Sequence, residues 1–155
     1  MGEEGRTELV VQHIRQTEPD VLGFAEIRDK DALRRIMRHH FSDFDFAVTD
    51  GQQEVELAVG WRRGHFGQAL FTQKREFKAA NPDLRPGALI SLEYKTEMYH
   101  VLFLHADSGL KPNDYGNRQD MFRRIWSLKE SLDKTQIAPA NLIVMGIRTE
   151  KGKLY

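Results

Sequence analysis

The chain has 155 residues, 40% of them hydrophobic and 30% charged, and its 23 basic and 23 acidic side chains give a formal net charge of zero. This length and composition fit one globular domain with a real core, and the balanced charge excludes a chain-wide positive field, so a nucleic-acid partner would need a local basic patch. The absence of cysteine excludes disulfides, cysteine-based zinc sites and thiol nucleophiles.

The first part of the sequence predicts a helix, a strand and a second helix in turn. Thr7 can cap a helix over 7–17, which ends before Pro19 because proline disfavours helix in the residue before it. The residues of this helix expected to face inward are Leu9, Val10 and Ile14. The apolar run 21–27 (VLGFAEI) follows as a strand, and Asp29 or Asp31 begins the next helix.

The middle of the sequence changes to a pattern of hairpins. Strands over 44–48 and 55–61 flank the turn Thr49-Asp50-Gly51, a further strand covers 69–72, and strands over 88–94 and 98–105 form a second hairpin.

The last part returns to alternating helix and strand. A polar loop over 106–117 precedes a helix over 118–132 and a strand over 141–145. The helix residues expected to face inward are Phe122, Ile125, Trp126 and Leu128. With no internal repeat and no linker, the sequence predicts a single domain over 1–155.

Three apolar runs indicate where chemistry would gather. The runs 21–27, 100–105 and 141–146 are short and apolar enough to be strands buried on both faces of a layered α/β domain. They close on Glu26, His105 and Gly146. Ligands of open α/β sheets bind beyond the carboxyl ends of the strands, so we expect Glu26 and His105 to reach a shared edge.

Each of these two residues has a structural and a functional interpretation. Strand alternation places Glu26 on the face of Leu22 and Phe24, where a carboxylate needs a compensating charge or metal, although it could instead pair with Arg28 or a helix terminus. His105 is either a hydrogen-bonded histidine of the core or loop, or a proton donor or transition-state stabiliser. In the second case Asp107 and Ser108, just beyond it, could orient the ring or contact a phosphate.

The residue types limit which metal ions the site could hold. Carboxylates without cysteine or a tight histidine cluster favour Mg²⁺ or Mn²⁺ over zinc. Magnesium commonly uses one or two protein carboxylates and completes its shell with water and substrate phosphate. Glu26 alone is therefore an adequate anchor for a phosphate substrate.

Taken together, these segments resemble the endonuclease/exonuclease/phosphatase superfamily. The stretches that carry the resemblance are 13–36, 55–66, 85–94, 99–109, 117–132 and 141–146. The resemblance implies an α+β or α/β fold, a layered β-sandwich flanked by helices (α/β/β/α), incomplete in this chain. It also implies that Glu26 binds the metal, that His105 is the first catalytic histidine, and that Arg85 faces the phosphate.

The sequence departs from the family pattern in three places. No strand carrying an asparagine precedes the first helix, Ile147-Arg148-Thr149 follows Gly146 where the family has Asp-x-Asn, and the closing Ser-Asp-His motif is absent. The chain could be a truncated or rearranged product, an incomplete sequence of a longer protein, or a short form that lost the chemistry. Because the group that would activate water is missing, we expect little or no hydrolysis from this sequence.

Three functions stay open. The first is a metal-dependent phosphoester hydrolase, phosphodiesterase or nuclease-like, in which water attacks the phosphate in line. The second is a catalytically inactive binding or regulatory module that pairs with another chain, such as a second copy, through open sheet edges. The third is an unrelated α/β protein in which Glu26 and His105 are structural. The neutral charge favours a small phosphoester over bulk DNA, with nucleic acid kept as a partner.

The sequence also bears on location. No apolar run approaches the roughly 18–20 residues of a membrane helix. The polar start MGEEGRTEL has no signal-peptide core. We therefore expect no membrane span and a cytoplasmic location.

Overall fold

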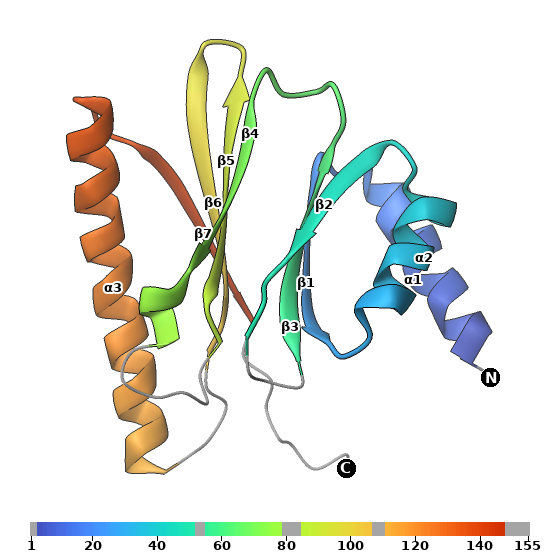
Figure 1. Ribbon diagram of the computed structural model, residues 1–155, viewed down its shortest axis with the longest axis horizontal. Coiled ribbons are helices and arrows are strands. Elements are labelled where there is room, and N and C mark those ends of the chain that lie inside the picture. Colours follow the sequence, from blue (N-terminus) through green and yellow to red (C-terminus); the bar gives the residue numbers. More distant parts are fainter. Residues whose placement is uncertain (1–2, 52–54, 79–84, 107–110, 148–155) are drawn as a thin grey trace.

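The computed structural model describes residues 3–51, 55–78, 85–106 and 111–147. Two sheets pack face to face, with two helices outside one sheet and one long helix outside the other (Figure 1). The predicted sandwich with α/β/β/α layers is therefore confirmed.

The first sheet and its helices come from the first part of the chain. The sheet has the order β1-β3-β2, and both outer strands run antiparallel to β3. Asp29 caps α2 by accepting hydrogen bonds from the backbone N–H groups of Asp31 and Ala32 at 2.8 and 2.9 Å. The elements are α1 (Glu3–Thr17), β1 (Val21–Ile27), α2 (Lys30–His40), β2 (Phe44–Val48) and β3 (Glu56–Arg62).

The second sheet comes from the rest of the chain and has the order β4-β5-β6-β7. Strands β4, β5 and β6 form an antiparallel meander, and α3 crosses over so that β7 runs parallel to β6. The elements are β4 (Ala69–Lys74), the 3₁₀ helix η1 (Arg75–Lys78), β5 (Gly87–Tyr94), β6 (Glu97–His105), α3 (Pro112–Gln136) and β7 (Asn141–Ile147).

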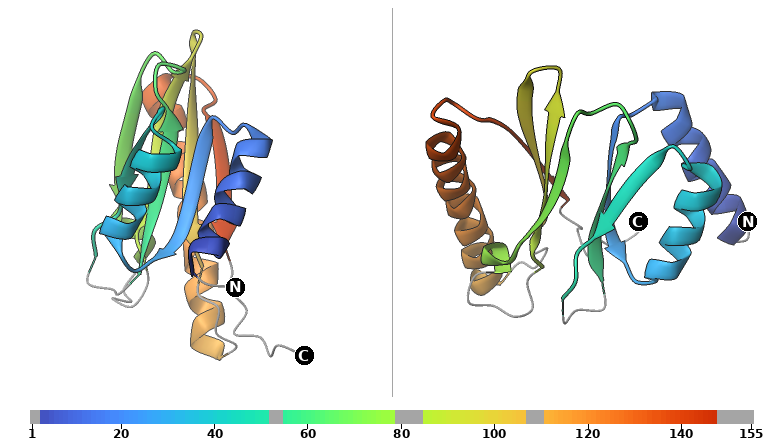
Figure 2. Two further views of the ribbon diagram at one scale, coloured as in Figure 1. Left: turned by 90° about the vertical axis from the view of Figure 1, so that its right-hand side faces the viewer. Right: turned by 45° about the horizontal axis from the view of Figure 1, so that its top comes forward.

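Three apolar clusters hold the four layers together: one between the helices and the first sheet, one between the sheets, and one under α3. The sheets approach closely at Gly23 of β1. A Cβ atom there would lie 2.0 Å from Cε1 of Phe103 on β6. The missing side chain of Gly23 thus allows this close approach of the sheets beside β1. Figure 2 shows the two sheets and their helices from two further sides.

The inward face predicted for α1 is partly wrong. The helix begins at Glu3 and not at Thr7, and Leu9 and Val10 are exposed. Val11 is buried and Ile14 packs against the same cluster. Consecutive helical residues point about 100° apart, so only one of three adjacent apolar residues can face the sheet.

The prediction for α3 is also partly right: Ile125 and Leu128 face the sheet as expected, and the other two residues do not. Phe122 and Trp126 are exposed, whereas Met121, Leu128 and the partly buried Ile125 face the sheet. The helix carries two apolar stripes that lie one residue apart, one with Met121, Ile125 and Leu128 and the other with Phe122 and Trp126. The longer stripe packs on the sheet. The helix also begins at Pro112, inside the predicted loop, because proline suits the first turn of a helix.

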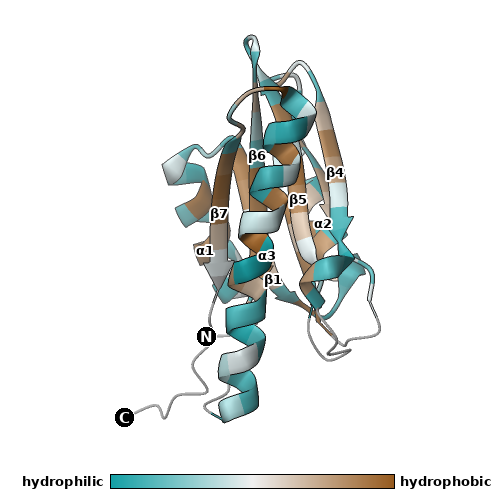
Figure 3. Cartoon of the chain, turned by 90° about the vertical axis from the view of Figure 1, so that its left-hand side faces the viewer, coloured by the Kyte–Doolittle hydropathy of each residue, from teal (hydrophilic) through white to brown (hydrophobic). Residues whose placement is uncertain are grey.

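Strand β7 is not buried on both faces as predicted. Ile143, Val144 and Met145 keep 39–51% of their surface exposed, because β7 is an edge strand of its sheet. Figure 3 shows the apolar strand beside α3. Strand β1 is also only half-buried, and of the three runs only the end of β6 is buried as predicted.

A buried histidine joins the second sheet to α3. Nδ1 of His100 lies 2.8 Å from Oγ of Ser91, and its Nε2 lies 2.7 Å from Nε2 of Gln136. Burial lowers the pKa of His100, so the folded chain favours the neutral ring. The ring thus bridges the two elements without a charge.

This histidine predicts a loss of stability in mild acid. The depressed pKa contributes stability that is present above the unfolded value of about 6.5 and is lost as the pH falls through the folded value. Urea unfolding at pH 7.5 and 5.5 should show a decrease in the free energy of unfolding. The decrease should be smaller in His100→Gln, which cannot titrate, and an equal decrease in both proteins would contradict the assignment.

Candidate functional site

Two predicted site residues meet at one edge of the sandwich. Strands β1 and β6 both run toward the lower edge in Figure 1 and end there. Oε1 of Glu26 lies 3.6 Å from Nε2 of His105, although the two residues belong to different sheets. The distance is slightly longer than a hydrogen bond, and it places a carboxylate and an imidazole at one point between the sheets.

A β-bulge directs Glu26 toward this point. Phe24 pairs with Ala58 and Ile27 pairs with Glu56, so β1 carries one extra residue between these pairs. Glu26 itself has φ 61°, a left-handed conformation that costs a non-glycine residue about 1–2 kcal/mol. The prediction that Glu26 shares the face of Leu22 and Phe24 is therefore wrong: those residues pack toward α1 and α2, and Glu26 approaches the other sheet.

His105 is a buried imidazole with unused hydrogen-bonding capacity. Its side chain is 3% exposed, and neither ring nitrogen has a hydrogen-bond partner among the described residues. Burial lowers the pKa of His105, the nearby Arg85 charge lowers it further, and Glu26 opposes both. The ring is therefore neutral at pH 7. Asp107 and Ser108, proposed to orient it, lie outside the described residues.

Arg85 joins the same edge from the segment before β5. Its Nε donates a hydrogen bond to the backbone carbonyl of Val55 at 3.2 Å, which ties it to the start of β3. Its positive charge acts on His105. The edge thus combines a carboxylate, a neutral imidazole and a guanidinium, and all three were predicted from the sequence.

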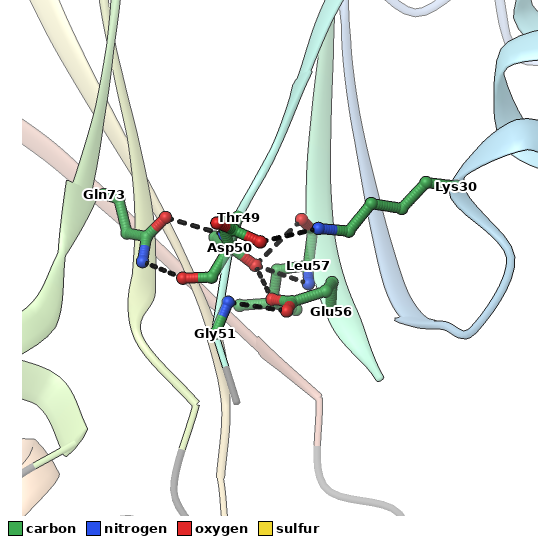
Figure 4. Close-up of polar contacts among 7 residues, drawn as sticks. All are labelled: Lys30, Thr49, Asp50, Gly51, Glu56, Leu57 and Gln73. Atoms are coloured by element: carbon green, nitrogen blue, oxygen red, sulfur yellow. Dashed lines mark hydrogen bonds and ion pairs between the residues drawn. The ribbon is translucent and has the colours of Figure 1, made fainter. Parts of the chain in front are cut away.

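The sequence analysis missed a polar network beside these residues, in the turn between β2 and β3 (Figure 4). Glu56 is 3% exposed, and it accepts hydrogen bonds from Oγ1 of Thr49 at 2.5 Å and from the backbone N–H of Gly51 at 2.8 Å. Thr49 is fully buried and also accepts from the backbone N–H of Leu57 at 3.0 Å. The sequence signal for this network was Glu56, a charged residue within the apolar run VELAV.

The residues at this edge fit only one kind of metal site. In the part of the chain that the structure describes, no three or more histidine, aspartate and glutamate side chains form a group that could hold a metal ion. Glu26 offers a half-exposed carboxylate next to an imidazole. Such a site suits a hard cation that takes most of its ligands from water and phosphate, and it does not suit structural zinc, which needs four protein ligands.

A polar hollow lies at the other end of the first sheet, away from Glu26. It has a volume of about 730 Å³ and includes Arg62 and His65. Arg62 binds Asp20 at 3.1 Å and Asp43 at 2.7 Å, and it donates to the carbonyl of Pro19 at 3.0 Å. The guanidinium of Arg62 therefore joins the loops before β1 and β2, and this residue serves the fold.

Comparison with known proteins shows the fold. No family model and no curated protein matches the sequence. An endonuclease/exonuclease/phosphatase family protein from Bacteroides thetaiotaomicron superposes with a TM-score of 0.67 at 12% identity, over 94% of this chain and 55% of that one. ANGEL2, a 2′,3′-cyclic phosphatase, gives 0.68 at 13% identity, over 94% of this chain and 44% of that one.

TDP2 from D. rerio, in complex with a single-strand DNA product, gives a TM-score of 0.58 at 15% identity, over 91% of this chain and 51% of that one. This chain therefore spans about half the length of the structures it resembles.

None of the described helices is long and apolar enough to cross a membrane.

Proposed function

We propose that this chain, which has the fold of endonuclease/exonuclease/phosphatase proteins, forms part of a divalent-metal-dependent phosphoester hydrolase. The observation that carries the proposal is the 3.6 Å approach of Glu26 and His105, one from each sheet, at the edge that also holds Arg85. Low-identity likeness informs the fold and leaves the substrate open, so the roles below rest on the geometry.

Each of the three residues has a role that its environment suits. The half-exposed Glu26 is the anchor for Mg²⁺ or Mn²⁺, which supplies polarisation of a phosphoryl oxygen when bound. Arg85 attracts the negatively charged phosphate. His105, neutral at pH 7, can donate a hydrogen bond from one ring nitrogen to a phosphoryl oxygen while the other nitrogen accepts. Water attack in line with the leaving oxygen would complete the hydrolysis.

The proposed substrate is a phosphoester, with single-stranded nucleic acid as one class. The TDP2 structure with a DNA product supports that class by analogy of fold. The zero net charge favours a smaller phosphoester, because extended nucleic acid is usually held by many basic contacts.

We place the protein in the cytoplasm, and we propose residues 1–155 as one partial domain of this type.

The first test measures binding. Mn²⁺ titration followed by electron paramagnetic resonance should show binding that Glu26→Gln weakens at least tenfold, about 1.4 kcal/mol. Glu18→Gln is the matched control, because Glu18 is also an exposed glutamate with positive φ (44°), and it lies before the start of β1, away from Glu26. Equal effects of the two substitutions on Mn²⁺ affinity would mean that Glu26 is not the metal anchor.

Turnover is the second readout. Cleavage of a chromogenic phosphodiester with Mg²⁺, lost in Glu26→Gln and in His105→Asn, would support a hydrolase. Mn²⁺ and phosphate binding without cleavage would favour the binding module instead. The absence of both in the folded wild-type chain would leave Glu26 and His105 as structural residues.

One observation favours the alternative function, a catalytically inactive module that pairs with another chain. Strand β7 (NLIVMGI) is an edge strand without any charged residue, and three of its apolar side chains, Ile143, Val144 and Met145, are exposed. Edge strands of monomeric proteins usually carry charges, prolines or bulges that prevent pairing. Homo-oligomerisation through β7 would appear in sedimentation as a concentration-dependent mass, and Val144→Lys should abolish it.

A further inference from the structure

The site has one group on each sheet, so its geometry depends on how the sheets are held at that edge. Glu26 belongs to the first sheet, and His105 belongs to the second. His105 lies two residues beyond Phe103, whose side chain packs between the sheets, so strand alternation places both on the inner face of β6. Any contact that joins the sheets nearby therefore also acts on the distance between the two groups.

Gln73 of β4 makes such a contact with Asp50 in the turn between β2 and β3. Its Oε1 accepts from the backbone N–H of Asp50 at 2.8 Å, and its Nε2 donates to the backbone carbonyl of Asp50 at 2.6 Å. Figure 4 shows the side chain reaching from β4 across to the turn. The amide of Gln73 thus pairs with both the N–H donor and the carbonyl acceptor of Asp50. This double contact fixes the distance and the orientation between β4 and the turn.

Gln73 also lies in line with the site. It pairs with Ala88 on β5, and Ala88 pairs with Phe103 on β6, so the three lie side by side across the second sheet. Phe71, two residues before Gln73, packs between the sheets. Gln73 therefore projects from the same face as His105, near the same edge.

Further contacts hold the described residues of this turn and connect it to the strand that carries Glu26. Glu56 fixes it through Thr49 and Gly51, and Lys30 of α2 binds the Asp50 carboxylate at 3.0 Å. The backbone of Glu56 pairs with Ile27, directly after Glu26. A displacement of this turn would therefore be transmitted to Glu26.

We infer that Gln73 is a positioning residue, which holds the two sheets at the spacing at which Glu26 and His105 act on one phosphate together. The inference deepens the proposed function and rests on it for the ligand. A shift of about 1 Å in such a site can cost two orders of magnitude in activity, so a contact between the sheets at this edge has a measurable consequence.

The test compares Gln73→Ala with Gln68→Ala, in which an exposed glutamine just before the same strand is removed. Gln73→Ala should leave the affinity for Mn²⁺ alone unchanged, because the proposed metal anchor is the Glu26 carboxylate with water, which needs no group from the second sheet. It should weaken binding of inorganic phosphate in the presence of Mn²⁺ by about fivefold or more, because phosphate needs groups from both sheets and so depends on the distance between Glu26 and His105. Gln68→Ala should change neither.

A second readout does not depend on any ligand. In Gln73→Ala, amide exchange at Asp50 should become faster and the NMR signal of the His105 ring should shift at constant pH, whereas the His100 ring should not. Gln73→Glu keeps the acceptor for the Asp50 N–H and should partly restore that protection. An unchanged His105 signal, or unchanged phosphate affinity in a chain that binds phosphate, would overturn the inference. Failure of the wild-type chain to bind either ligand would instead overturn the proposed function.

Discussion

Replacement of His105 by leucine is expected to stabilise the folded chain and to abolish its binding of phosphate. The ring is 3% exposed, and its two nitrogens lack hydrogen-bond partners in the described part of the chain. An unsatisfied buried polar group costs about 1–3 kcal/mol, which an apolar side chain of similar size avoids. A rise of this order in the free energy of unfolding, measured in urea, would identify His105 as a residue kept for function.

His100→Leu is the matched control for this prediction. Both ring nitrogens of His100 are hydrogen-bonded, to Ser91 and Gln136, and the ring is equally buried. Its removal should therefore destabilise the chain and leave phosphate binding unchanged. If His105→Leu destabilised the chain as much as His100→Leu does, His105 would be a structural histidine, and the proposed site would lose its imidazole.

Gly23→Ala is expected to cause the largest loss of stability. The added Cβ would lie 2.0 Å from Cε1 and 2.3 Å from Cδ1 of Phe103. Because an aromatic ring in a packed core cannot move aside freely, the sheets must separate or the ring must leave its position, at a cost of about 1–3 kcal/mol or more. Separation of the sheets would also move Glu26 away from His105.

Two further variants test this mechanism. Gly23→Ala combined with Phe103→Leu should recover part of the stability, since the smaller side chain leaves space for the methyl group. Gly116→Ala, in α3 with no atom within 4 Å of the added Cβ, should instead stabilise the chain by about 0.5–1 kcal/mol. A loss of stability at Gly23 that Phe103→Leu did not reduce would mean that the contact between the sheets is not its cause.

The sequence alone was sufficient to predict most of the fold. The seven strands that the structure describes were all predicted within a few residues of their observed bounds, because alternating or continuous apolar runs bounded by turn residues are strong local signals. The helix faces were less predictable. In α1 and α3, adjacent apolar residues competed for one inward position, and only packing against the sheet decides between Val10 and Val11, or between Met121 and Phe122.

The candidate site was predictable as a set of residues but not as a geometry. The ends of two strands and the family resemblance pointed to Glu26, His105 and Arg85. The bulge at Glu26 could not be predicted, because one extra residue in β1 reverses the direction of the side chain without leaving a sequence pattern. The contact between Gln73 and Asp50 joins positions 23 residues apart, which periodicity cannot detect.

Each sheet, with its own helices, is contributed by one continuous stretch, residues 3–62 and residues 69–147. The connection between them passes through Gly64, whose surroundings are open within 4 Å of an added Cβ. A cut there would divide the molecule into two fragments, one bearing the acid and the other the imidazole. Phosphate binding that is recovered when the fragments are mixed would then show that they have reassembled. The site can therefore be used to measure how completely the two halves of the fold associate in the native arrangement.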